Sequence, residues 1–288
     1  MELVGQRHKG LQLLRSTLGD DALSYQQLGG YELFLEKDEL LFDTCSQNMK
    51  DVNSLLKPVF KADVFSKVSN HFNFSRIQNQ YIRNQFEGQI DAGKMMQALI
   101  KRVQELGVII LNNTKVERYF EHSDKIEIQT THFELSALKL IFTTNGFAKQ
   151  LINEDVQPAR AQALITKPLK NLQIKGTFHL DCGYYYFRNV DNRILLGGGR
   201  NLDIKGETTT KLAETEKIQQ SLENILKYTI LPKIDFKIEQ RWSGIMGVGS
   251  QKKPIVKQLS NHVYCGVRMG GMGIAIGSLI GKEVSGFF

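Results

Sequence analysis

Glycine residues gather near the C-terminus between two apolar segments, and this feature most restricts how the chain folds. The stretch Met269–Gly281 is the most apolar in the sequence, yet it is too short and too glycine-rich to cross a bilayer. We expect a strand over Val263–Val267, a glycine-rich turn, and a helix over Gly273–Val284. Such a turn lets a ligand approach the backbone closely and directs N–H groups at an electron-rich group. A tight turn that packs a helix on a sheet explains the same spacing equally well.

The first half of the chain alternates helical and strand patterns. The clearest helix is Asp91–Leu106, where Asp91 is the expected N-cap, apolar residues recur on one face, and Gly107 ends the helix. The other predicted elements of this half are helices over Val4–Leu18 and over Lys50–Leu56, the second closed by Pro58, strands over Tyr31–Leu35, Val108–Leu111 and Lys139–Thr144, and a hairpin of Val116–Phe120 with Lys125–Thr131.

The second half is richer in strands. Its predicted strands are Gln162–Thr166, Thr177–Leu180, Tyr184–Arg188, Arg193–Leu196 and Phe236–Trp242. A long helix is predicted over Thr208–Leu226. There is no internal repeat, and the pattern predicts a mixed α+β fold with a substantial antiparallel sheet.

Composition excludes several classes of protein. The 288 residues are 41% hydrophobic and 23% charged, which is ordinary for a globular chain and untypical of disorder. The net charge of +7 suits an anionic ligand or nucleic acid, but the basic residues are scattered, so solubility alone explains it as well. Three widely spaced cysteines without CxxC spacing argue against a disulfide framework and fit a reducing cytoplasm.

Other common signatures are missing from the sequence. The polar segment Met1–Gly10 contains no signal-peptide core, so we expect a cytoplasmic protein without a membrane segment. The six histidines show neither HxxxH nor HExxH spacing, so no metal site is expected. Neither a GxSxG elbow nor a GxxxxGK[ST] loop occurs.

Two further places are typical of ligand loops. Asn145-Gly146 ends an apolar strand, and ligands of open sheets sit outside the carboxyl ends of strands, although a routine turn has the same sequence. Gly197–Gly199 also follows a strand, and no helix begins directly after it, which favours a bulge over a ligand loop.

Taken in order, several weak motifs form a fairly specific series. They are Phe86–Asp91, Val108–Val116, Thr143–Ala148, Val156–Gln162, Gly183–Arg188, Ile194–Gly199, Trp242–Met246 and the C-terminal glycine run. In this order and spacing, over nearly its whole length, the chain resembles the superfamily of FAD-dependent D-amino-acid, glycine and sarcosine oxidases.

The resemblance implies a role for particular residues. The cofactor-binding residues that it implies are Val116 at the adenine, Thr144, Asn145 and Gly146 at a strand end beside the cofactor, Gly244 in a return strand, and Gly270, Gly271, Met272 and Gly273 over the pyrimidine ring of the flavin. The implied substrate-binding residues are Tyr184, Tyr186, Trp242 and Arg268. Alternation in the tyrosine-rich strand places Tyr184 and Tyr186 on one face and Tyr185 on the other.

The arginines depart from the family pattern. Many members have an arginine where Met246 stands. Arg268 lies about one position from the place where glycine oxidases keep an arginine that binds the substrate carboxylate. We expect Arg268 to be the carboxylate anchor, and a structural salt bridge is an equally good interpretation. Lys252 and Lys253 are either cationic neighbours of the flavin or solvated.

A second departure concerns the start of the fold. Members open with a strand, a GxGxxG turn and a helix, and the chain begins at what resembles the helix after that unit. Compared with the family pattern, roughly 80 residues are then expected to be absent, which is the size of a βαβ unit with its flanks. We therefore expect exposed apolar edges in the sheet of the FAD-binding domain. The predicted fold is an incomplete α/β FAD-binding domain interleaved with an antiparallel-sheet substrate domain. Residues 1–82 are expected to form part of the substrate domain, with the FAD-binding domain as the alternative for the first helix. Residues 83–160 are expected to form part of the FAD-binding domain, residues 161–243 the substrate domain, and residues 244–288 the C-terminal part of the FAD-binding domain.

The implied function is oxidation of the C–N bond of a small amine or amino acid, with FAD as cofactor. A hydride passes from the carbon that bears the amine to the flavin, and water hydrolyses the resulting imine. Two alternatives stay open: a flavin oxidase that acts on modified tRNA, for which a basic cluster is lacking, and a non-catalytic remnant of the family. The sequence does not define the substrate, the electron acceptor or the oligomeric state.

Overall fold

The computed structural model describes every residue from Met1 to Phe288, and its largest element is a mixed eight-stranded sheet. In spatial order the strands are β12 (Ile238–Val248), β8 (Gln157–Thr166), β11 (Arg193–Gly198), β10 (Tyr185–Val190), β9 (Thr177–Leu180), β1 (Gly30–Leu33), β3 (Gln80–Asn84) and β2 (Phe65–Ser69). Neighbouring strands run antiparallel except β1 and β9, which run parallel. The parallel pair therefore joins strands from the first and second halves of the sequence into one sheet.

One face of this sheet carries the main hydrophobic core, which α5 (Glu216–Ile225) and the π-helical turn η4 (Leu226–Ile230) cover. Phe178 stacks on Phe187 with ring centroids 4.6 Å apart, and Tyr31 stacks on Phe178 at 5.0 Å. These rings come from adjacent strands, and such aromatic pairs contribute beyond their buried area. They therefore help to hold β1 beside β9.

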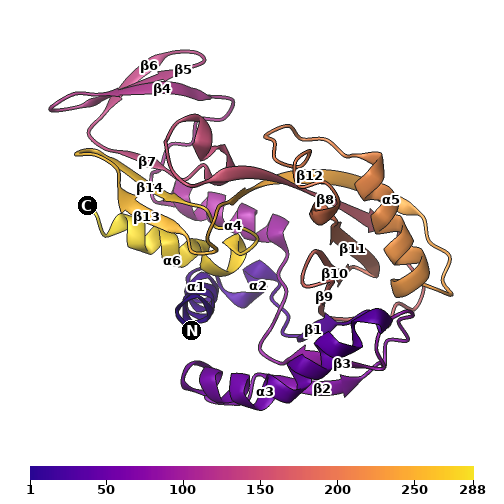
Figure 1. Ribbon diagram of the computed structural model, residues 1–288. Helices are drawn as coiled ribbons and strands as arrows, with labels where there is room; N and C mark the ends of the chain where they lie inside the picture. Colours follow the sequence, from indigo (N-terminus) through magenta and orange to yellow (C-terminus); the bar gives the residue numbers. More distant parts are fainter.

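A second group of layers lies beside the large sheet (Figure 1). Its centre is the three-stranded sheet of β13 (Ile255–Gln258), β14 (Val263–Val267) and β7 (Leu140–Phe142), in which β14 runs parallel to β7. Helix α6 (Gly273–Ser285) packs on one side of it, and the antiparallel sheet of β4 (Val116–Glu121), β5 (Ile126–Thr130) and β6 (Glu134–Ala137) packs on the other. The predicted α+β class and the predicted hairpin are confirmed.

Helix α1 (Glu2–Leu18) packs directly on α6 and with α2 (Asp20–Leu23) and α4 (Ala92–Glu105). At Gly10 the two backbones are so close that a Cβ would collide with the carbonyl oxygen of Ala275. The Asp91 side chain accepts a hydrogen bond from the backbone N–H of Lys94 at 3.0 Å, which confirms the predicted N-cap of α4. The chain also forms α3 (Glu39–Phe60) and the 3₁₀ turns η1 (Glu36–Asp38), η2 (Asn145–Gln150) and η3 (Arg200–Leu202).

Helix α3 is longer than the sequence predicts. It begins at Glu39 and passes through Pro58 to end at Phe60, so the prediction that Pro58 closes the helix is wrong. Proline lacks one N–H, but near the end of a helix this loses only one hydrogen bond. The Phe60 ring lies 4.8 Å from that of Phe86 and 4.9 Å from that of His8, and these contacts hold the last turn.

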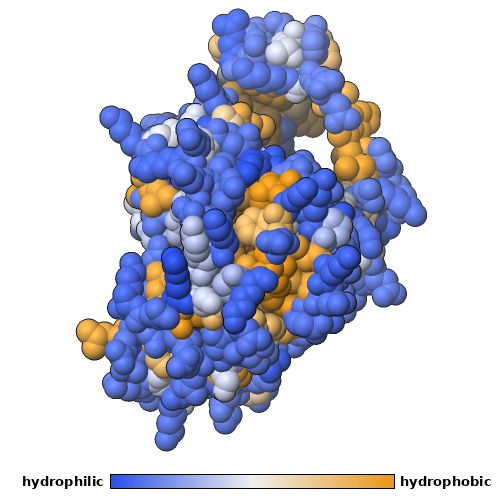
Figure 2. Space-filling view, turned by 90° about the vertical axis from the view of Figure 1, so that its right-hand side faces the viewer, coloured by the Kyte–Doolittle hydropathy of each residue, from blue (hydrophilic) through white to orange (hydrophobic).

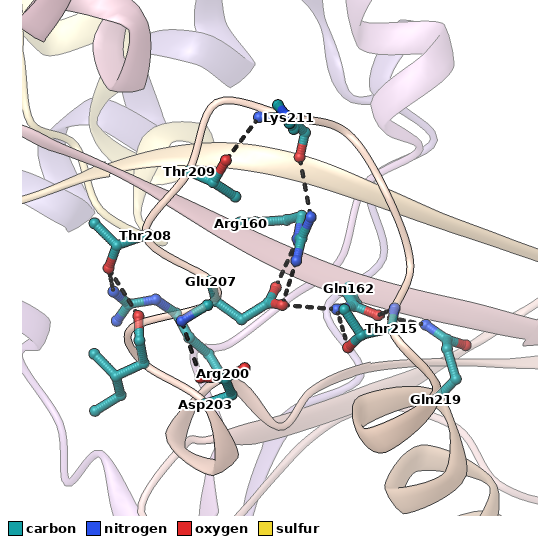
Figure 3. Close-up of polar contacts among 12 residues, drawn as sticks. Arg160, Gln162, Arg200, Asp203, Glu207, Thr208, Thr209, Lys211, Thr215 and Gln219 are labelled. Carbon is teal, nitrogen blue, oxygen red and sulfur yellow. Dashed lines mark hydrogen bonds and ion pairs between the residues drawn. The ribbon is translucent and has the colours of Figure 1, made fainter.

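The predicted helix over Thr208–Leu226 is wrong in its first part, because α5 begins only at Glu216. Residues before it follow an irregular path over a buried polar network (Figure 3). Arg160 donates to the Lys211 carbonyl at 3.3 Å, and the Gln162 side chain accepts from the Thr215 N–H at 2.9 Å. These two side chains thus pair with the Lys211 carbonyl and the Thr215 N–H, which are backbone groups that would pair within a helix.

The centre of this network is a buried carboxylate. Glu207 has no exposed surface, and its two carboxylate oxygens accept from Arg160 at 2.6 and 2.9 Å. The Gln162 amide donates a third hydrogen bond at 3.0 Å. The network thus anchors the loop from η3 to α5 onto β8.

No strand forms over Val108–Leu111, so this prediction is also wrong. The four residues are 52%, 83%, 42% and 52% exposed. No strand of residues 1–288 offers this segment a backbone partner, so the segment does not join a sheet. Figure 2 shows hydrophobic side chains that gather in a hollow on the face it presents. No helix combines the length and the apolarity that crossing a bilayer requires.

Candidate functional site

The glycine run lies between β14 and α6, as predicted, and its backbone is open to solvent. Gly270 has a φ of 54°, and a Cβ added at Gly270 or Gly273 would meet no atom within 4 Å. No side chain caps α6, and the N–H groups of Gly273 and Ile274 donate to no protein acceptor. Free N–H groups at a helix start attract electron-rich groups. The turn can therefore receive a flat, electron-rich ligand.

The end of β7 is tied to this run. Asn145 has a φ of 45°, and its side-chain oxygen accepts a hydrogen bond from the Met269 N–H at 3.0 Å. The Gly270 N–H donates to the Gly247 carbonyl of β12 at 2.9 Å. At Gly146 a Cβ would collide with the carbonyl of Met246. The structure thus brings Asn145 together with the glycine run and places Gly146 against β12.

Arg268 lies just before the run, and its guanidinium is bound by protein acceptors through Nε and Nη1. It is 8% exposed and forms an ion pair with Asp155, with Nη1 and Oδ2 2.6 Å apart. It also donates to the carbonyls of Asp155 at 3.0 Å and Lys253 at 2.9 Å. Hydrogen bonds from Ser250, together with Arg268, lower the pKa of Asp155. The structural salt bridge considered from the sequence is therefore present.

The second wall of the site is the face of the large sheet opposite the core. Glu32 of β1, His179 of β9 and Tyr186 of β10 are direct neighbours across these strands. Tyr185 is 6% exposed and packs in the core, whereas Tyr184 and Tyr186 are 46% and 38% exposed. Tyr185 and Tyr186 point to opposite faces of β10, as predicted, whereas Tyr184 lies in the turn before the strand.

The same row continues across the sheet to β12. Tyr186 faces Gly197, Gly197 faces Ala163, and Ala163 faces Trp242. A Cβ at Gly197 would collide with the ring and hydroxyl of Tyr186, so this glycine allows the ring to lie across β11. Desolvation raises the pKa of Tyr186, which therefore stays a hydroxyl donor. The half-buried Trp242 lies at the far end of the row.

Glu32 and His179 form a hydrogen-bonded pair that sequence reasoning missed. The Glu32 carboxylate lies 3.0 Å from Nδ1 of His179, and Nε2 of His179 makes no hydrogen bond. Burial by itself lowers the pKa of His179, but the hydrogen bond and charge of Glu32 outweigh it and raise the pKa above 6.5. The two residues lie 147 positions apart, and only the position of a lone histidine in a short alternating strand pointed to this face.

Arg7 of α1 is exposed and lies beside the glycine run. Its Nε donates to the thioether of Met272 at 2.9 Å, and it forms no ion pair. Desolvation by the neighbouring protein lowers the pKa of Arg7, and the charge of Glu87 partly offsets this. The charges of both Arg7 and Glu87 also act on His179. Arg7 therefore lies against the glycine run and within electrostatic reach of His179, and we take the region among helix α1, the glycine run and this sheet face as the candidate site, which we call the cleft.

Val116 and Gly244 are the other two residues expected to bind the cofactor. Val116 is half-buried at the start of β4, opposite Thr130, in the layer beyond β14. Gly244 lies in β12 opposite Ala161, and a Cβ there would meet no atom within 4 Å. The structure does not bring Val116 to the cleft.

Comparisons with known proteins agree on one fold. A family described as "FAD dependent oxidoreductase" matches residues 2–286. No curated protein matches the chain. Among solved structures, L-proline dehydrogenase from P. horikoshii is 17% identical with a TM-score of 0.78, over 98% of this chain and 77% of its own.

Two oxidases are similarly close in structure. Glycine oxidase from Geobacillus kaustophilus is 13% identical with a TM-score of 0.79, over 96% of this chain and 76% of its own. Iminodiacetate oxidase from Chelativorans sp. is 18% identical with a TM-score of 0.79, over 99% of this chain and 78% of its own. At these identities the likeness establishes the fold.

Proposed function

This chain belongs to the family of FAD-dependent oxidoreductases, and from that premise we propose that it oxidises the C–N bond of an amine or amino acid. Solved structures of similar fold include enzymes named for proline, glycine and iminodiacetate, all of which carry a C–N bond. The proposal is supported above all by one observation: the open glycine run, which carries free N–H groups, contacts Arg7, and the charge of Arg7 acts on His179 of the Glu32–His179 pair beside Tyr186.

FAD is the cofactor of the family, and the residues around the glycine run fit its flavin end. The absence of a steric obstacle at Gly270 and Gly273 leaves room for a ring, and the free N–H groups of α6 suit its electron-rich side. We assign Gly270–Gly273 to the pyrimidine side and Thr144–Gly146 to the strand end beside it. Val116 at the adenine and Gly244 in the return strand stay proposals from the resemblance. Residues 1–288 contain no GxGxxG turn, and we assign none of them to the pyrophosphate.

When bound, FAD supplies a two-electron acceptor for the hydride on the carbon that bears the amine. The amine nitrogen must first lose its ammonium proton, because its lone pair forms the new C=N bond. Nε2 of His179 is free to accept that proton, and Glu32 fixes the ring through Nδ1. The imine then leaves the site or reacts with water to give a carbonyl compound and ammonia.

Other residues of the cleft bind and orient the substrate in this proposal. The hydroxyls of Tyr184 and Tyr186 donate hydrogen bonds, and Trp242 borders the far end of the row. A substrate carboxylate binds Arg7, the arginine of the cleft that has no ion-pair partner. Arg268, proposed from the resemblance as that anchor, instead positions the glycine run through Asp155.

Purified protein loaded with FAD tests the proposal. Amine substrates should yield a carbonyl product and ammonia in equal amounts, and the His179→Ala variant should retain flavin but lose most turnover. A flavin-loaded protein that turns over none of a panel of amines and amino acids would refute the proposal.

A further inference from the structure

A cavity of about 400 Å³ lies beside the Glu32–His179 pair, between α3 and the strands β1, β2 and β3. Figure 1 shows α3 alongside these strands at the lower end of the molecule. Its volume falls within the range of about 300–1,000 Å³ that is typical of small-molecule sites. Most of its wall is apolar, and the largest such side chains are those of Phe34, Leu41, Met49, Phe65 and Ile82.

The position of α3 over this cavity is fixed by one buried side chain. Asn53 is 7% exposed, and its oxygen accepts from the N–H groups of Val64 at 2.9 Å and Phe65 at 2.8 Å. Its amide nitrogen donates to the Phe65 carbonyl at 2.8 Å. The wall is therefore a preformed part of the fold.

The charged groups of the cavity are all acidic. Glu32, Asp38 and Asp181 line it, and no lysine, arginine or histidine does, although the whole chain has a net charge of +7. Three carboxylates repel an anion and attract a cation, most strongly where apolar walls exclude water. The cavity is thus complementary to an apolar group attached to an ammonium ion.

Glu32 belongs both to this wall and to the pair with His179. We propose that the cavity binds the apolar substituent of a substrate ammonium ion, so that the substrate is a bulky hydrophobic amine or amino acid. This inference rests on the proposed function, because it places the amine at His179 and the substituent towards α3. A substrate as small as glycine has no apolar substituent that could occupy the cavity.

Cys45 offers a readout that does not depend on turnover. It lines the cavity, as does the exposed Cys182, whereas Cys265 is fully buried in the core. In a Cys182→Ser background, Cys45 becomes the reporter for alkylation and Cys265 an internal unreactive control. The rate of Cys45 alkylation by iodoacetamide is measured with increasing 2-phenylethylammonium, and in parallel with 3-phenylpropanoate, which has a similar apolar group and the opposite charge.

The ammonium probe should slow alkylation of Cys45 in a saturable manner, and the carboxylate probe should not. Asp181→Asn should weaken this protection about tenfold, which corresponds to loss of one partly desolvated charge interaction. Val52→Trp should fill the cavity and abolish protection. Leu55→Trp is the matched control, since Leu55 lies on the same helix, is 60% exposed and does not line the cavity.

Equal protection by both probes, or protection that Val52→Trp leaves intact, would overturn the cavity assignment. If amines are oxidised but neither probe protects Cys45, the cavity assignment fails and the proposed function stands. If the ammonium probe protects Cys45 but no amine is oxidised, the proposed function fails and the cavity remains a site for hydrophobic ammonium ions.

Discussion

The carboxylate of Glu32 on β1 lies 3.0 Å from Nδ1 of His179 on β9, and this contact exists because the two strands pair in parallel. The pair lies next to Tyr186 on one sheet face, and the charge of Arg7, which contacts the glycine run, acts on His179. It also forms part of the wall of the acidic cavity. One hydrogen bond thus connects the proposed proton acceptor to the proposed substrate-binding surface.

The pH dependence of stability should report this pair. Because the pKa of His179 is raised above 6.5, the folded state binds the proton more tightly than the unfolded state. The resulting stability is fully present below 6.5 and is lost as the pH rises through the folded pKa. Glu32→Gln should therefore lower the free energy of unfolding more on the acid side of this range than on the alkaline side, as urea titrations would measure. An equal loss of unfolding free energy on the acid side and on the alkaline side would show that the charge of the pair does not stabilise the fold.

Arg7→Ala should weaken binding of substrates that carry a carboxylate. Because Arg7 is exposed, its ion pair with a carboxylate is worth about 1 kcal/mol, so KM for such substrates should rise about fivefold, and KM for amines without a carboxylate should change little. Steady-state kinetics with matched amino acids and amines measures the difference. Arg15→Ala is the control on the same helix, because Arg15 pairs with Asp20 at 2.7 Å outside the cleft. A parallel rise for both substrate classes would assign Arg7 a structural role.

The buried network below β8 should show strong coupling. Glu207→Leu leaves the Arg160 guanidinium buried without its partner, so it should cost about 3–5 kcal/mol of unfolding free energy. The double variant Arg160→Met with Glu207→Leu removes both charges and should recover most of that loss. Chemical denaturation of the two single variants and the double variant measures the coupling. Additive effects would contradict a direct ion pair.

Asn145 should be sensitive to the loss of its side-chain oxygen. Asn145→Ala removes the acceptor for the Met269 N–H and strains a residue with a φ of 45°, so it should cost about 1–3 kcal/mol and weaken FAD binding. Asn145→Asp keeps an oxygen acceptor and should be much closer to the wild type. Asn145→Gly relieves the backbone strain but not the lost hydrogen bond. If the Asn145→Ala and Asn145→Asp variants bind FAD with the same affinity in titrations, the hydrogen bond from Met269 does not position the glycine run.

Local features of the fold were readable from the sequence. The glycine run before α6, the N-cap at Asp91 and the alternation of Tyr185 and Tyr186 depend on neighbours in the chain. Periodicity and capping act over one or two turns, so single-sequence patterns report them well.

Features that depend on distant residues were missed. The Glu32–His179 pair requires the parallel pairing of β1 and β9, which no local pattern encodes. The helix predicted from Thr208 failed because side chains of β8 pair with the backbone there, and the strand predicted at Val108–Leu111 failed because no partner strand lies beside it. In each case tertiary context overrode a local preference.

Anaerobic rapid mixing of the FAD-loaded protein with a hydrophobic amine tests the central claim most directly. We predict that the visible absorbance of the oxidised flavin disappears in one substrate-dependent phase, and that deuterium on the carbon bearing the amine slows this phase. His179→Ala should slow it further at equal flavin content. A flavin whose absorbance stays unchanged with every amine, or whose reduction is insensitive both to deuterium and to His179, would contradict hydride transfer in this cleft.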